Sequence, residues 1–287
     1  MSDQLRFFKE RAECAVVVPA YGEPQYLEAT LRSLISTQGD SVRILVLDDG
    51  SDSSFIQNLV KQFQPRISYI RNPTNLGVSN NFNKGLRIAN AKYVMLVGHD
   101  DLMLGCMTSV VNKTQFLDRS FFAILTPAKT VNSFGKTSLS LSAFAKSLLT
   151  PSNSGIISAK RFLVSLLVGN WVFNPSIIWN TEDLESELFS DRYLFCMDWD
   201  LLLRLAYRNR TCIYSETEIL MYRRHLESIS MRNLNGRYAE ELEVLRMNYK
   251  LANRPNFLCF ILTKVAIMPR LNYAIRKVQS FGLQKIK

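Results

Sequence analysis

The sequence predicts an α/β fold in which a mostly parallel sheet carries helices on both faces. Apolar runs that end in polar or turn residues recur along the first half of the chain, which is typical of buried strands. Segments with apolar residues at helical spacing lie between some of these runs. Strands that alternate with helices pair in parallel, and the connecting helices cover both faces of the sheet.

The individual elements follow from these patterns. We expect strands at residues 14–18, 43–47, 67–70, 93–97 and 121–125, and helices at residues 28–36, 78–89, 158–168, 198–207 and 237–251. Residues 129–155 are rich in Ser, Thr, Asn and Gly and predict a long loop. The sequence contains no internal repeat, so we expect one domain at residues 1–235 and a C-terminal helical extension at residues 236–287.

The composition is that of a folded protein. Of the 287 residues, 47% are hydrophobic and 21% are charged, which excludes a disordered chain. The five cysteines include no C-x-x-C pair, which favours a reducing cytoplasm over a disulfide framework or a zinc site. The N-terminus lacks the apolar segment of a signal peptide, and the apolar run at residues 257–268 is too short to span a membrane.

The positive charge is concentrated near the C-terminus. The formal net charge is +10, and residues 254–287 carry seven Lys or Arg side chains and no acid. Apolar residues fall on one helical face on each side of Pro269, so this basic amphipathic extension is predicted either to bind an anionic membrane surface or to pack on its own domain. A nucleic-acid-binding protein would instead show basic residues interleaved with aromatics, so we expect no nucleic-acid partner.

Polar residues follow three of the predicted strands. The carboxyl ends of parallel strands meet at one edge of a sheet, where ligands bind in such folds. Pro19, Tyr21 and Glu23 follow the first strand, and Asp48 and Asp49 end the second. A carboxylate beside a tight turn can accept hydrogen bonds from a base or a ribose, although Asp and Gly are also ordinary turn residues.

Two further motifs carry acids. Asp100 and Asp101 follow the strand at residues 93–97, and two adjacent carboxylates are costly unless a cation such as Mg²⁺ or Mn²⁺ neutralises them. Asp198 and Asp200 open an apolar helix. Helix capping is the alternative for both pairs.

Taken together, the motifs resemble those of the family 2 inverting glycosyltransferases of the bacterial surface-polysaccharide type. The matching segments are VVPAYGE, LVLDDGSDSS, NPTNLGVSNNFNKGL, AKYVMLVGHDDL, MDWDLLLRLA and YRRHLESIS, over about residues 14–231. The resemblance implies the GT-A fold, a Rossmann-like arrangement with helices on both faces of the sheet. Two positions depart from the family's motifs: Met197 stands where Glu is common, and Phe82 stands where many members have Arg.

The resemblance also implies roles for individual residues. Asp198 is expected to be the catalytic base, and Asp101 and His225 are expected to lie at a Mn²⁺ or Mg²⁺ ion. The residues expected to bind the nucleotide-sugar are Pro19, Tyr21, Glu23, Asp49, Asn75, Gly77, Asn83 and Asp100.

The activity implied is transfer of a sugar from a nucleotide-sugar donor, first of all a UDP-sugar, to a hydroxyl of a glycan or lipid-linked acceptor. Such an enzyme would act in cell-surface polysaccharide synthesis, in the cytoplasm or peripherally at the inner face of the cell membrane. The alternative is a catalytically silent GT-A scaffold, which failure to bind nucleotides would indicate.

Overall fold

The computed structural model describes residues 8–117, 120–137, 144, 146–184, 187–224, 234–251, 266, 269–270 and 273–274. Within these residues the main sheet has eight strands in the order β3-β2-β1-β4-β9-β6-β10-β8. Their bounds are β1 Ala12–Ala20, β2 Val42–Asp48, β3 Ile67–Arg71, β4 Ala91–Leu96, β6 Ala123–Leu125, β8 Gly155–Ile157, β9 Ile177–Asn180 and β10 Cys212–Tyr214. The five predicted strands are confirmed as β1, β2, β3, β4 and β6.

The sheet is mostly parallel, as predicted. Strands β3, β2, β1 and β4 all pair in parallel, and β10 pairs in parallel with β6. Strand β9 runs antiparallel to both β4 and β6, and β8 runs antiparallel to β10. A smaller sheet has the order β5-β11-β7, with β5 at Leu102–Met103, β7 at Ala128–Val131 and β11 at Leu220–Arg223. The segment predicted as a loop at residues 129–155 therefore begins within β7 and reaches β8.

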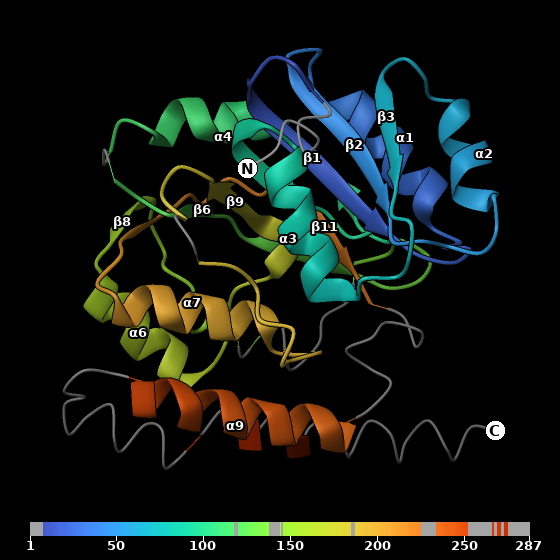
Figure 1. Cartoon of the computed structure of the whole chain (residues 1–287). Helices are drawn as coiled ribbons and strands as arrows, with labels where there is room; N and C mark the ends of the chain where they lie inside the picture. The colour runs from blue at the N-terminus through green and yellow to red at the C-terminus, as the bar shows by residue number, and fades with distance from the viewer. Residues whose placement is uncertain are drawn as a thin grey trace.

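Helices cover both faces of the main sheet (Figure 1). On one face lie α1 Leu27–Thr37, α2 Phe55–Lys61 and α4 Met107–Thr114, and their apolar side chains join one buried cluster. On the other face lie α3 Val78–Ile88, α6 Ala159–Val168, α7 Met197–Tyr207 and α9 Leu234–Leu251. Strand β1 serves both clusters because successive side chains point to opposite faces: Val16 faces one and Val17 the other.

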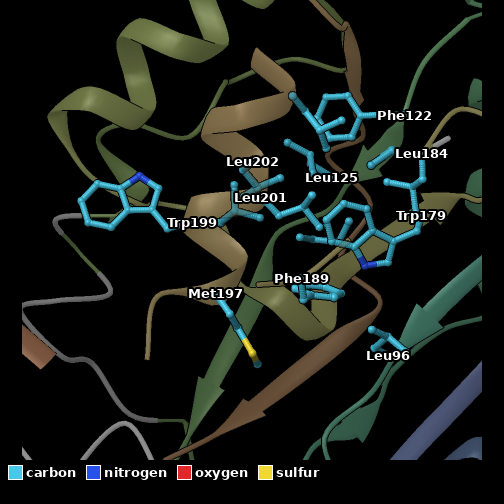
Figure 2. Close-up of a cluster of buried hydrophobic side chains, with 14 of the residues drawn as sticks. Leu96, Phe122, Leu125, Trp179, Leu184, Phe189, Met197, Trp199, Leu201 and Leu202 are labelled. Atoms are coloured by element: carbon cyan, nitrogen blue, oxygen red, sulfur yellow. The ribbon is translucent and has the colours of Figure 1, made fainter. Parts of the chain in front are cut away.

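The start of α7 is anchored in the larger core (Figure 2). Leu201 and Leu202 of α7 lie in one buried cluster with Leu125 of β6 and Trp179 of β9, and all four are fully buried. Trp179 also meets the ring of Phe189 edge-on, with centroids 5.6 Å apart. Core packing therefore fixes where the polar residues of the first turn of α7 can lie.

Helix α9 packs on α7, along the side away from the sheet (Figure 1). Its side chains Val244 and Leu245 are fully buried in the same core. The predicted boundary at residue 235 would cut this helix, so we propose that the compact unit includes α9. Of the later residues, the described Ala266 and Pro269 are buried, and the ring of Tyr273 stacks on Tyr238 at 4.7 Å.

Among the described residues, no helix combines the length and apolar content that crossing a membrane requires.

Candidate active site

A cavity of about 860 Å³ opens at the carboxyl ends of β1, β2 and β4 and extends to α7 and α9. Nine of the predicted site residues line it: Pro19, Tyr21, Glu23, Asp49, Asn75, Gly77, Asp100, Asp101 and Asp198. They come from segments up to 179 residues apart, counted from Pro19 to Asp198 (198 − 19). The fold therefore gathers most of the predicted residues around one space.

Asp49 organises the loop that leads into α3. Its Oδ1 accepts hydrogen bonds from the Leu76 amide at 2.9 Å and from Asn72 Nδ2 at 2.7 Å. Its Oδ2 accepts one from the Gly77 amide at 3.0 Å, and Gly77 has a φ of +80°, which favours glycine. The carboxylate thus fixes two residues of the loop while lining the cavity itself.

The carboxylates of Asp100 and Asp101 lie close to Gly98, which has no side chain. A Cβ added to Gly98 would lie 2.7 Å from a carboxylate oxygen of Asp100 and 2.7 Å from one of Asp101. Any side chain at residue 98 would therefore displace both carboxylates. Arg223 of β11 holds the same turn, since its amide donates to Asp101 Oδ1 at 2.9 Å and its Nε donates to the Asp100 carbonyl at 2.8 Å.

The electrostatics of this pair suit a cation. Burial, followed by the neighbouring Asp100, raises the pKa of Asp101 well above its ordinary value, against the lowering effect of backbone hydrogen bonds from Arg223 and Gly98. Among the described residues, no cluster of three or more His, Cys, Asp or Glu side chains is placed to hold a metal ion. Two convergent carboxylates instead fit a Mg²⁺ or Mn²⁺ ion that is coordinated mainly by substrate phosphates and water.

Asp198 lies in the first turn of α7 with its carboxylate at the cavity. It accepts hydrogen bonds from the Trp199 amide at 2.8 Å and from Asn170 Nδ2 at 3.1 Å. Burial raises the pKa of Asp198, and the nearby cations Lys146 and Arg237 act in the opposite direction. A carboxylate whose pKa is raised binds a proton more readily, which is the property a general base needs.

The side chain of Asp200 lies away from the cavity that Asp198 lines. Its carboxylate pairs with Arg204 Nε at 2.8 Å and accepts a hydrogen bond from Asn248 Nδ2 at 3.0 Å, and it does not line the cavity. We therefore assign Asp200 to the packing of α7 against α9.

Two predicted site residues stand apart from this arrangement. Asn83 does not line the cavity. Its Nδ2 donates a hydrogen bond to the Phe189 carbonyl at 2.8 Å, and its Oδ1 accepts one from the Phe189 amide at 2.9 Å. The side chain of Asn83 therefore holds the backbone of Phe189, and we no longer assign Asn83 to the donor contacts. His225 lies outside the described residues.

The two departures from the family's motifs have visible roles. The sulfur of Met197 accepts a hydrogen bond from Ser79 Oγ at 3.0 Å, which joins α7 to α3. The ring of Phe82 meets Phe189 edge-on, with centroids 5.5 Å apart. Both side chains also line the cavity.

Several polar residues of the cavity were not predicted from the sequence. Asn170, Lys146, Arg224 and Arg237 line it together with Asp198. Arg224 belongs to the quoted YRRH motif, so that motif was a signal for it. Lys146 and Arg237 come from a polar segment and from a helix, and nothing in their local pattern marks them.

A comparison with known families identifies the family of this chain. The family model described as "Glycosyl transferase family 2" matches residues 15–172, which is more than half of the chain. The chain belongs to glycosyl transferase family 2. The match contains the segments that carry Asp49, Asp100 and Asp101, whereas α7 and α9 lie beyond its end.

Two curated relatives of this family 2 chain match over short stretches. An uncharacterized glycosyltransferase of Haemophilus influenzae is 32% identical over 90 residues, which are 31% of this chain and 28% of that protein. The GalNAc(5)-diNAcBac-PP-undecaprenol beta-1,3-glucosyltransferase of Campylobacter jejuni is 31% identical over 104 residues, which are 34% of this chain and 33% of that protein. The chain therefore matches about a third or less of the length of either relative.

Solved structures share the fold over most of the chain. The S. aureus TarS 1–349 complex with UDP-GlcNAc superposes with a TM-score of 0.67 at 14% identity, covering 91% of this chain and 73% of that one. The mannosyltransferase PcManGT of Pyrobaculum calidifontis, in complex with GDP-Man and Mn²⁺, superposes with a TM-score of 0.60 at 13% identity, covering 92% and 72%. At these identities the comparison establishes the GT-A fold of this family 2 chain.

Proposed function

We propose that this protein is an inverting glycosyltransferase that moves a sugar from a nucleotide-sugar donor to an acceptor hydroxyl. The observation that carries the proposal is a single cavity lined both by the carboxylates of Asp49, Asp100 and Asp101 and by the half-buried carboxylate of Asp198. The first group suits a nucleoside diphosphate with its cation, and the second suits proton removal from an acceptor.

In the proposed reaction Asp198 takes the proton of the acceptor hydroxyl. The oxygen then forms a bond to the anomeric carbon from the face opposite the diphosphate, and the bond from that carbon to the diphosphate oxygen breaks with its electron pair going to the leaving group. Asn170 and the Trp199 amide hold the carboxylate of Asp198 in place. Burial of Asp198 favours its protonated form once the proton has been taken.

Asp101 and Asp100 are the residues that would hold Mn²⁺ or Mg²⁺. The ion would act as a Lewis acid that stabilises the charge of the departing diphosphate. His225, which the sequence analysis placed at the same ion, is retained as part of the proposal.

The comparisons favour a nucleotide-sugar donor and suggest an acceptor. One neighbour of the same fold binds UDP-GlcNAc and another binds GDP-Man. We propose a UDP-sugar first, with Pro19, Tyr21, Glu23, Asn75 and Gly77 at the nucleoside. The name of the Campylobacter jejuni relative contains a lipid-linked acceptor, which supports a glycan or lipid-linked acceptor here and a role in surface polysaccharide synthesis.

A ligand panel tests the donor. We expect one of the UDP-, GDP- or dTDP-sugars to raise the unfolding temperature, and to raise it more with Mn²⁺ than with EDTA, because a ligand that binds only the native state stabilises it. Failure of every donor to bind would favour the silent GT-A scaffold, and binding without release of the nucleoside diphosphate would contradict the transfer step. No temperature shift with any donor would contradict the proposal.

We further propose that the basic extension holds the enzyme at an anionic membrane surface on the cytoplasmic side. Each basic residue near such a surface contributes about 1 kcal/mol. Because Pro269 lines the cavity, removing the whole extension would also disturb the site. We therefore expect a variant with Arg276, Lys277, Lys285 and Lys287 replaced by Gln to lose flotation with phosphatidylserine vesicles, while the wild-type chain floats at low salt. Wild-type chain that stays with the soluble fraction would contradict this proposal.

A further inference from the structure

Helix α9 reaches the segment that immediately precedes Asp198. The side chain of Glu240, on α9, lies against the backbone of residues 194–196. Its Oε1 accepts a hydrogen bond from the Leu194 amide at 3.1 Å. Its Oε2 accepts bonds from the Phe195 amide at 2.7 Å and the Cys196 amide at 3.3 Å. One carboxylate thus binds three successive backbone N–H groups that lie more than 40 residues away along the chain.

These three amides lie at or before the start of α7, so the helix offers them no acceptor. Cys196 is the N-cap of α7, and the cap makes no side-chain hydrogen bond. Backbone N–H groups at and before a helix start have no partner in the helix, and a partly buried N–H without an acceptor is costly. The Glu240 carboxylate fills this role with charge-assisted bonds, which are stronger than neutral ones.

The contact bears directly on Asp198, which lies two residues after Cys196. On its C-terminal side, Leu201 and Leu202 fix α7 in the core. On its N-terminal side, the Glu240 contact fixes the backbone that enters the helix. Asn248, one residue of the same α9, holds Asp200 Oδ1 at 3.0 Å. The position of the Asp198 carboxylate is therefore set between the core and α9.

We infer that Glu240 is a positioning residue for the transfer reaction: it holds the start of α7 so that Asp198 meets the acceptor hydroxyl. This inference rests on the proposed function. Glu240 does not line the cavity, so its removal should change turnover without changing donor contacts. A misplacement of a reacting group by about 1 Å can cost about 10²-fold in rate.

The test uses the full chain with two variants at this position and one control. Glu240→Ala loses all three hydrogen bonds, whereas Glu240→Gln keeps one acceptor oxygen and should be intermediate. The matched control is Glu243→Gln, on the same helix, because Glu243 pairs with the exposed Arg192 and makes no contact to residues 194–196 among the bonds that the structure describes. Each chain is measured by hydrogen–deuterium exchange of residues 190–200, by affinity for UDP-GlcNAc or whichever panel donor binds, and by release of the nucleoside diphosphate.

We expect Glu240→Ala to exchange faster at residues 194–196 and to lose about 10²-fold in turnover, with donor affinity unchanged. Glu243→Gln should match the wild type in all three measurements. Faster exchange with wild-type turnover, or unchanged exchange, would overturn the inference alone. Should Glu240→Ala fail to fold, Glu240→Gln carries the same comparison. A wild-type chain that turns over no donor overturns the proposed function and the positioning role of Glu240 with it.

Discussion

Replacing Asp198 by Asn is expected to reduce transfer by about 10²- to 10⁴-fold, the range for removal of a general base. The amide has nearly the same shape, so it keeps an oxygen that can accept from the Trp199 amide or from Asn170, but it cannot take the acceptor proton. Donor affinity should stay unchanged, because the carboxylates at Asp49, Asp100 and Asp101 are untouched. The measurement is release of the nucleoside diphosphate beside the Kd for the donor.

The pH dependence adds a second readout to this variant. Burial raises the pKa of Asp198 above its ordinary value of 3.8, so wild-type turnover should be lost on the acid side at a pH above 3.8 as the base becomes protonated. The contribution of Asp198 to the stability of the fold depends on pH in the opposite direction. A carboxyl group that binds its proton more tightly in the native state contributes stability below pH 3.8 and loses it as the pH rises through its raised pKa. Asp198→Asn should therefore unfold at no lower temperature than the wild type at neutral pH.

A matched control separates the base from its neighbours. Asp191 is an exposed carboxylate in the segment before α7, and Asp191→Asn should leave turnover unchanged. Asp200→Asn should instead lower the unfolding temperature, because it weakens the ion pair with Arg204. Near wild-type turnover in Asp198→Asn would show that another group takes the proton.

Asp101→Asn is expected to remove the Mn²⁺-dependent part of the donor affinity. Loss of a metal's outer-shell partner costs about 10- to 100-fold in metal affinity, and loss of a direct ligand should cost at least as much. The fold should be retained, because the amide oxygen can still accept from the Arg223 amide and a buried charge is removed. Donor binding is measured by calorimetry in Mn²⁺ and in EDTA for both chains.

The outcomes of this comparison are distinct. In EDTA the wild type and Asp101→Asn should bind the donor equally, and only the wild type should improve with Mn²⁺. Gly98→Ala provides a steric version of the same test, since its Cβ would displace both carboxylates. Gly39→Ala is its control, because an added Cβ there meets nothing within 4 Å. A wild-type donor affinity that is equal in Mn²⁺ and EDTA would contradict the metal proposal.

Much of the fold could be predicted from local patterns. The apolar runs that became β1, β2 and β4 are buried on both faces, so each is a continuous hydrophobic stretch that stands out in the sequence. Strands β8, β10 and β11 have three or four residues each, too few for a period to be recognised. Their pairing comes from partners far along the chain, so only the folded sheet reveals them.

The candidate site likewise has residues that the sequence predicts and residues that only the folded structure reveals. Asp49, Asp100 and Asp101 could be placed at one edge from sequence alone, because each follows a strand and parallel strands end together. Asn83 shows the limit of that reasoning: it lies in a matching motif, yet its amide bonds to Phe189, 106 residues away. The spacing of residues along a helix predicts which face a side chain occupies. Which other segment that face contacts depends on tertiary packing.

What the sequence by itself determined was the strands β1, β2, β3, β4 and β6, the helices α1, α3, α6, α7 and α9, the edge at which the acids gather and the acidic first turn of α7. The tertiary structure alone decided that Asp198 faces the cavity while Asp200 pairs with Arg204, and that α9 supplies Arg237 and Glu240 to the surroundings of Asp198. The physical reason is that the first set depends on local periodicity, whereas the second depends on side-chain contacts between segments whose separation along the chain leaves no periodic signal.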